Sequence, residues 1–206
     1  MNIERIVSVD NNQNCYIVYD DSLEGIVIDP GSDGEEIFDK IKKLGIRIKY
    51  ILLTHCHYDH IEGLGILRKL TGAEVVASFE CNLGIQSASI NLSMLFSDQI
   101  SEEPADLIIN DSDIIKAGNM EIKVITTPGH TKGGVCFLID NELFSGDTLF
   151  LRSVGRTDFP GGSSDTLIKS IKEKLYILDD DTIVNPWHGN DTIINFEKRY
   201  NMFVKA

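Results

Sequence analysis

Cysteine is scarce in this chain and basic residues are outnumbered, and both shortages narrow the classes of protein it can belong to. The 206 residues contain only four cysteines, with no CxxC spacing: Cys15, Cys56, Cys81 and Cys136. We interpret them as reduced thiols rather than a disulfide framework. Lys and Arg number 19 against 32 Asp and Glu, for a formal net charge of -13. This acidity argues against nucleic acid as a partner, since phosphate backbones are bound by clustered cations.

Long apolar runs are also lacking. No stretch approaches the roughly 18 consecutive apolar residues of a membrane span. The N-terminus carries no apolar core of a signal peptide, because polar residues occupy positions 10–14. We therefore expect a cytoplasmic protein that does not associate with a membrane. The mass of 23.0 kDa and the 42% hydrophobic content predict a single globular domain over residues 1–206.

Hydrophobic patterns predict strands at both ends of the chain and helices between and after them. The segment 87–98 is the least readable, and a helix with an insertion is expected there. This grouping predicts two mainly β layers with helices outside them. The expected strands are 3–7, 15–19, 25–29, 48–53, 75–77, 107–109, 114–115, 122–125, 135–139, 143–145 and 182–184, and the other expected helices are 34–44, 61–70, 164–178 and 190–200.

All five histidines occupy positions that a metal-dependent hydrolase would need. His55, His57 and His60 share one segment, THCHYDH, with Asp59. Neutral imidazole is the commonest metal ligand, and burying so many titratable groups without compensation is costly. A lone histidine is usually a surface or core residue, but this density favours a metal site. The remaining two histidines each follow an expected strand, and a simple loop position is their alternative: His130 and His188.

The spacing within the segment permits two metal ions. His55 and His57 can face one ion, while Asp59 and His60 can face a second. Two ions about 3.5–4 Å apart need an anionic bridge. Asp147, in the turn FSGDT after a strand, is the natural candidate. Its alternative is a turn or helix-capping aspartate.

Four motifs together resemble the metallo-β-lactamase superfamily: THxHxDH, PGHT, SGD and PxHG. The segments GDTLF and GRTDF most resemble its glyoxalase II-like hydrolases. The resemblance implies an α/β (α+β) fold, a four-layer αββα sandwich. It places His55, His57 and His130 on one metal ion and Asp59, His60 and His188 on the other. Asp147 then bridges the two ions.

The implied function is a metal-dependent hydrolase that cleaves a small thioester or related acyl compound with a metal-bound hydroxide. The cofactors would be two divalent metal ions, with zinc as the first expectation and iron or manganese as alternatives. Asp59 is the expected catalytic residue, because it can both ligate metal and orient the hydroxide. Arg156 is the candidate substrate-binding residue, since its planar fork suits a carboxylate. A structural ion pair with Asp158 is the alternative role of this arginine.

Several departures from glyoxalase II shape the alternatives. Only 18 residues follow His188, so the helical domain that contacts glutathione is missing, which argues against glutathione as the thiol. Trp187 stands where the family usually has glycine, and the Cys56 thiol is expected to point away from the metal. A mononuclear-iron persulfide dioxygenase and a catalytically silent metal-binding module remain alternatives. A β-lactamase is disfavoured because such enzymes are exported, and a nuclease because the chain is acidic.

Overall fold

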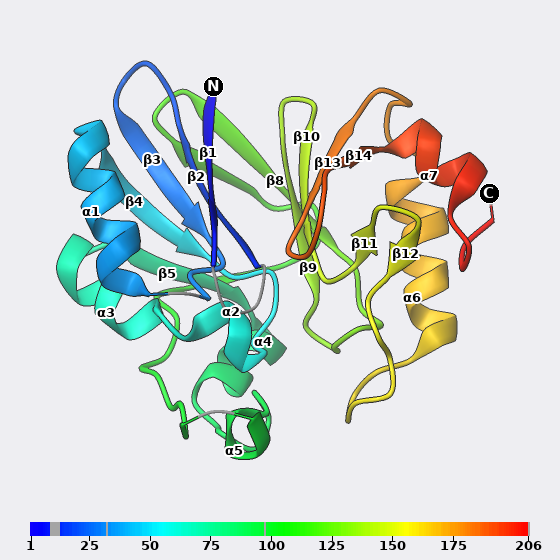
Figure 1. Cartoon of the computed structure of the whole chain (residues 1–206), viewed down its shortest axis with the longest axis horizontal. Coiled ribbons are helices and arrows are strands. Elements are labelled where there is room, and N and C mark those ends of the chain that lie inside the picture. The colour runs from blue at the N-terminus through cyan, green and yellow to red at the C-terminus, as the bar shows by residue number, and fades with distance from the viewer. Residues whose placement is uncertain (9–12, 32, 97, 206) are drawn as a thin grey trace.

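Two six-stranded sheets form the centre of the molecule, with helices on both outer faces (Figure 1). The computed structural model describes residues 1–8, 13–31, 33–96 and 98–205. Residues 10–12, part of the polar stretch that argues against a signal peptide, lie outside the described residues. The first sheet has the strand order β1 to β6 and the second the order β14-β13-β10-β9-β8-β7. The first sheet contains β1 (Asn2–Val7), β2 (Asn14–Tyr19), β3 (Glu24–Ile28), β4 (Arg47–Leu52), β5 (Glu74–Ser78) and β6 (Leu107–Ile109).

The second sheet is built mainly from antiparallel hairpins. Its strands are β7 (Ile114–Ala117), β8 (Met120–Thr126), β9 (Val135–Ile139), β10 (Glu142–Gly146), β13 (Ile183–Pro186) and β14 (Thr192–Ile193). Only the pairing of β10 with β13 is parallel. A separate two-stranded ribbon, β11 (Leu149–Phe150) with β12 (Ser153–Val154), follows β10.

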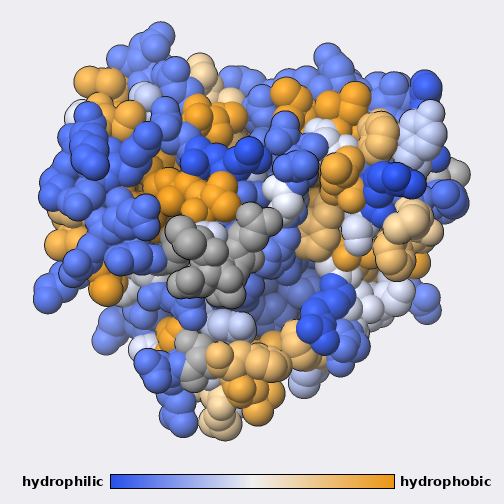
Figure 2. Space-filling view, viewed as in Figure 1, coloured by the Kyte–Doolittle hydropathy of each residue, from blue (hydrophilic) through white to orange (hydrophobic). Residues whose placement is uncertain are grey.

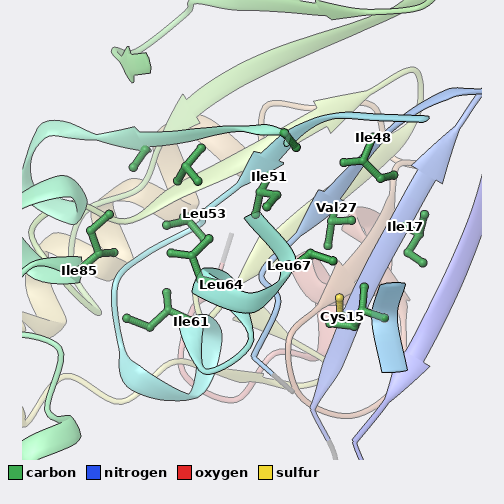
Figure 3. Packing of buried hydrophobic residues seen from close by; sticks show 14 of the residues in the cluster. Cys15, Ile17, Val27, Ile48, Ile51, Leu53, Ile61, Leu64, Leu67 and Ile85 are labelled. Atoms are coloured by element: carbon green, nitrogen blue, oxygen red, sulfur yellow. The ribbon is translucent and has the colours of Figure 1, made fainter. Parts of the chain in front are cut away.

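Three apolar layers hold this sandwich together. Between the sheets, Leu52 and Val76 pack with Phe137 and Phe144 in one buried cluster. A second cluster joins the first sheet to α1 (Gly34–Leu44) and α3 (Leu64–Thr71), which cover its outer face (Figures 1 and 3). A third joins the other sheet to α6 (Ser164–Ser170) and α7 (Ile194–Tyr200). Burial of apolar side chains on both faces of each sheet requires four layers, which confirms the expected αββα sandwich.

Helix α1 has the predicted bounds because its ends carry clear signals. The Asp33 side chain accepts hydrogen bonds from the first-turn amides of Glu35 and Glu36, and Gly45 ends the helix in a left-handed conformation. Ile37 and Ile41 face the sheet from this helix. The strand that follows, β4, leads directly into the histidine segment.

Four expected elements differ in the structure. The helix expected at 61–70 begins earlier, as the short α2 (Tyr58–Ile61), and continues after a break as α3. The helix expected at 164–178 is α6 followed by a π-helical turn, η1 (Ile171–Leu175). Within the expected helix 190–200, Thr192 and Ile193 form β14 instead, because they pair with β13. Among its described residues, the segment 87–98 contains only the short α5 (Ser93–Phe96), and α4 (Phe79–Ile85) is an element that the sequence pattern does not predict.

Within the described residues, no helix combines the length and apolar character needed to cross a bilayer. The cytoplasmic location and the single-domain organisation stay predictions.

Candidate metal centre

Three imidazoles converge at the C-terminal end of β4. The Nε2 atom of His55 lies 3.0 Å from Nδ1 of His57, and Nε2 of His130 lies 3.2 Å and 2.9 Å from these two nitrogens. Tetrahedral zinc with Zn–N bonds of about 2.0–2.1 Å would set its nitrogen ligands about 3.4 Å apart. The three rings are buried, and the spacing of their nitrogens fits a shared cation.

The protonation state of these imidazoles also supports a metal site. Burial lowers the pKa of His55 well below its usual range, and the neighbouring histidines lower it further. Burial, followed by the charge of His130, lowers the pKa of His57 to about 3. Both side chains are therefore neutral at physiological pH, which is the protonation state a metal ligand requires.

A second group of side chains lies next to the first. The Nε2 atom of His60 is 3.6 Å from Oδ1 of Asp147 and 3.9 Å from Oδ2 of Asp59. That same Asp59 oxygen is 3.8 Å from Nε2 of His188. The other oxygen of Asp147, Oδ2, is 3.5 Å from His130 in the first group. The two oxygens of Asp147 thus face the two groups, as a bridging carboxylate would.

Two atoms in this second group lack partners. Among the described residues, Nε2 of His60 and Oδ1 of Asp147 are buried without a hydrogen bond. Buried polar atoms are nearly always paired, and exceptions often mark an unoccupied ion position. Burial acts to lower the pKa of His60, but the carboxylates of Asp29 and Asp59 outweigh it and raise the pKa to about 10. Carboxylates that favour a proton at this imidazole also favour a metal cation there.

Asp29 is a functional residue that the sequence reading did not single out. It lies at the end of β3, is almost completely buried and has a φ of 48°. Its Oδ2 lies 2.9 Å from Nδ1 of His60 and accepts a hydrogen bond from the Thr54 hydroxyl at 2.6 Å. Its Oδ1 accepts from the Thr54 amide at 2.7 Å. A carboxylate on Nδ1 directs the Nε2 lone pair of the imidazole toward the centre.

His130 is oriented in a similar way by the main chain. Its Nδ1 lies 2.7 Å from the carbonyl oxygen of Arg156 and donates to it, which leaves Nε2 free for the cluster. The contact also links the first group of ligands to the loop that carries Arg156.

His188 is held by residues from the other end of the sequence. The amide of Asn14 donates to the carbonyl of Trp187 at 2.7 Å, and the Asn14 side chain donates to the carbonyls of Pro186 and Gly189 at 2.9 Å. The Tyr16 hydroxyl donates to the same Pro186 carbonyl at 2.7 Å. These contacts fix the loop beside the second group.

Trp187 fills the space beneath the second group. Its ring is buried and stacks on the imidazole of His60, with 4.3 Å between centroids and 29° between planes. Gly31 makes this packing possible, because a Cβ there would lie 2.4 Å from the Trp187 ring and 1.6 Å from the carbonyl oxygen of Asp59. The large side chain in place of glycine is thus a packing partner of a candidate ligand.

Arg156 stands at the mouth of the centre. A cavity of about 210 Å³ lies above the two groups and is lined by Arg156 together with candidate ligands from both. The guanidinium forms a bidentate ion pair with Asp158, with both hydrogen bonds at 2.8 Å, and lies 3.9 Å from the Phe159 ring centroid. The structure therefore shows the ion pair while leaving Arg156 beside the cavity. The Cys56 thiol packs against Gly84 of α4, consistent with its expected orientation.

Comparisons with known proteins agree with this geometry. Residues 9–187 match the family described as the metallo-beta-lactamase superfamily. The chain is 35% identical to the hydroxyacylglutathione hydrolase GloC of Haemophilus influenzae, with 100% of this chain and 99% of that protein aligned. The chain belongs to the metallo-β-lactamase superfamily.

Solved structures show the same relationship. The BLEG-1 B3 metallo-beta-lactamase superposes with a TM-score of 0.95 at 32% identity over the full length of both chains. TTHA1623 in a di-iron-bound form superposes with a TM-score of 0.86 at 28% identity, and the match covers 98% of this chain and 100% of that one. ETHE1 from Myxococcus xanthus superposes with a TM-score of 0.81 at 28% identity, and the match covers 98% of this chain and 84% of that one.

Proposed function

We propose that this protein is a binuclear metal-dependent hydrolase that cleaves small thioesters. The observation that carries the proposal is the position of Asp147, whose two oxygens face His130 on one side and His60 on the other. His55, His57 and His130 would hold one ion, and Asp59, His60 and His188 the other. Bound divalent ions lower the pKa of water toward neutrality and stabilise the oxyanion of an attacked carbonyl.

The protein's own residues would position the reactants. Asp59 lines the cavity and accepts a hydrogen bond from the Gln13 side chain at 3.3 Å, which holds its carboxylate in place. It is the proposed catalytic residue, with the role of orienting the attacking water. Arg156 would hold a substrate carboxylate at the rim. A thiolate leaving group needs little protonation, so no additional general acid is required.

The comparisons widen the range of thiols to be considered. GloC has hydroxyacylglutathione in its name and aligns over 99% of its length. A protein that aligns with this chain along almost its whole length thus carries that name. Hydroxyacylglutathione thus belongs among the candidate substrates, contrary to the argument from the missing domain.

The decisive experiment pairs metal analysis with a substrate panel. Protein loaded separately with zinc, iron or manganese is expected to bind two ions per chain and to hydrolyse thioesters. The panel includes hydroxyacylglutathione and, because BLEG-1 superposes over the full length, a β-lactam. Faster turnover of the β-lactam than of every thioester would overturn the substrate class. One ion per chain in fully loaded protein would overturn the binuclear centre.

The similarity to ETHE1 supports a second candidate, a mononuclear-iron persulfide dioxygenase. A dioxygenase consumes oxygen with its substrate, whereas a hydrolase does not. Oxygen uptake by iron-loaded protein with a persulfide, together with one iron per chain and no thioester cleavage, would establish this alternative. Two ions without turnover of any substrate would indicate a catalytically silent metal-binding module.

A further inference from the structure

The cavity above the metal centre is smaller than most pockets that enclose a small organic ligand. Its volume is about 210 Å³, whereas such pockets usually measure about 300–1,000 Å³. A longer substrate whose thioester group lies there would extend beyond this cavity on at least one side.

A second cavity adjoins the first. It measures about 560 Å³ and shares His57 with the cavity above the metal centre. Phe159 lines the smaller cavity, while the next residues in the chain, Pro160 and Gly161, line the larger one. A substrate arm leaving the reacting group past His57 would therefore enter the larger cavity directly.

One wall of this cavity is apolar. It is formed by Phe79 and Leu83 of α4 and by Ile90 in the following turn. These side chains are 58%, 46% and 52% exposed. Apolar side chains gathered in a cleft and open to solvent commonly mark a binding surface. Figure 2 shows further apolar surface at the bottom of the view, where Figure 1 places α5.

A second segment lines the same cavity. Thr131, Lys132 and Gly133 follow the candidate ligand His130 in the chain. The Ser78 hydroxyl, at the start of α4, donates to the Gly133 carbonyl at 2.7 Å and ties this segment to α4. Lys132 and Glu80 supply one charge of each sign, so the cavity offers no excess charge to an ionic group.

We propose that this larger cavity, the α4 groove, binds an uncharged apolar arm of the thioester. The other half of the substrate carries the anionic group and lies toward Arg156. The inference rests on the proposed function and specifies its substrate class: a thioester with an alkyl or aryl group on one side of the scissile bond. That group can belong to the acyl part or to the thiol part, and the test separates the two.

The test compares two series of thioesters on metal-loaded protein, one lengthened from acetyl to hexanoyl and one lengthened on the thiol side. Wild-type kcat/KM is expected to rise about fourfold for each methylene that enters the groove, in one series only. Leu83→Ser should flatten that rise. Leu70→Ser is the matched control, because Leu70 is a helical leucine of α3 with 41% exposure away from both cavities. It should keep the wild-type rise.

Ile90→Ser provides a second groove variant if Leu83→Ser fails to fold by thermal melting. No rise with chain length in either series, or a rise that survives in a folded groove variant, would overturn the proposal. Calorimetric binding of a non-hydrolysable alkyl thioether distinguishes this result from failure of the hydrolase function. Length-dependent thioether binding that Leu83→Ser abolishes, without cleavage of any thioester, would support the groove and reject the hydrolase. Cleavage of thioesters without any dependence on chain length would support the hydrolase and reject the groove.

Discussion

Replacement of Asp29 by asparagine should selectively damage the second group of ligands. The Asp29 carboxylate accepts three hydrogen bonds, from the amide and hydroxyl of Thr54 and from Nδ1 of His60. Asparagine has nearly the same shape and tolerates the φ of 48° at this position. If its oxygen stays on the Thr54 amide, its NH₂ group faces His60. Nδ1 must then accept, and in the neutral ring that a metal ion requires the proton lies on Nε2, the atom that would bind metal.

The magnitude follows from what the substitution leaves intact. The Asp29 carboxylate reaches the first group only indirectly, through Thr54 and through the His60 ring that packs on His55, so the affinity of the first ion should change less than that of the second. Loss of a carboxylate that orients a metal-bound histidine typically costs 10- to 100-fold in affinity. This corresponds to about 1.4–2.8 kcal/mol for the second ion.

The assay is a calorimetric titration of metal-free protein with zinc, followed by kcat/KM for a thioester. Asp20→Asn is the matched control, because Asp20 is also buried and accepts from Ser22 and Asn119 but faces no histidine. If a folded Asp29→Asn protein bound both zinc ions with wild-type affinity, the tautomer argument would be refuted. Equal weakening of both steps would show that Asp29 acts on the whole loop and not through His60.

Three further results are expected. Asp59→Asn should lower kcat by at least about a hundredfold with an unchanged circular dichroism spectrum, since the amide loses the charge that orients water; wild-type turnover would place the essential chemistry elsewhere. Arg156→Ala should raise KM for carboxylate-bearing thioesters about tenfold more than for neutral ones. Asp158→Asn removes only the exposed ion pair and should leave this KM ratio unchanged. Equal effects of Arg156→Ala on both substrates would make Arg156 structural. Trp187 is the only tryptophan and stacks on His60, so its fluorescence should change as the second ion binds, and an unchanged signal at two ions per chain would contradict the assigned ligands.

The apolar patterns predicted most strands because these are short apolar runs bounded by turn residues, whereas the four-layer sandwich was implied by the resemblance of the motifs. For the helix that follows the histidine segment, the sequence pattern predicted a start that is too late. The first turn of α2 consists of Tyr58, Asp59 and His60, and polar candidate ligands give no apolar periodicity. The residues of β14 were assigned to a helix because their strand conformation depends on pairing with β13, a partner that is not visible in a local pattern.

The candidate ligands were identifiable from the sequence, but their supporting residues were not. Asp29 gave only the local signal of an aspartate between a buried strand and Pro30-Gly31, which is also typical of a simple turn. Its role depends on a contact with His60, 31 positions away. Asn14 and Tyr16 support the His188 loop across more than 165 positions. Such contacts arise only when the fold brings the strand ends together.

The opposite pKa shifts in the two groups imply an order of metal loading. The pKa of His57 is lowered to about 3 by burial and by His130, so this ligand is already free of a proton at pH 7. His60 has its pKa raised to about 10, because nearby carboxylates outweigh burial, and it holds a proton at pH 7 until a metal ion displaces it. The first group should therefore fill first.

This difference predicts more proton release in the second step than in the first. Below pH 10, the affinity for the second ion should fall up to about tenfold for each unit of decreasing pH, because one proton competes for His60. His55 and His57 should contribute little to the pH dependence of the first step between pH 6 and 8, since burial and the neighbouring histidines lower the pKa of both. Titrations in buffers of different ionisation enthalpy measure the protons released with each ion. Equal release in both steps, or a second step that does not respond to pH, would show that the carboxylates around His60 do not hold a proton in the metal-free protein, and the argument for ordered loading would fail.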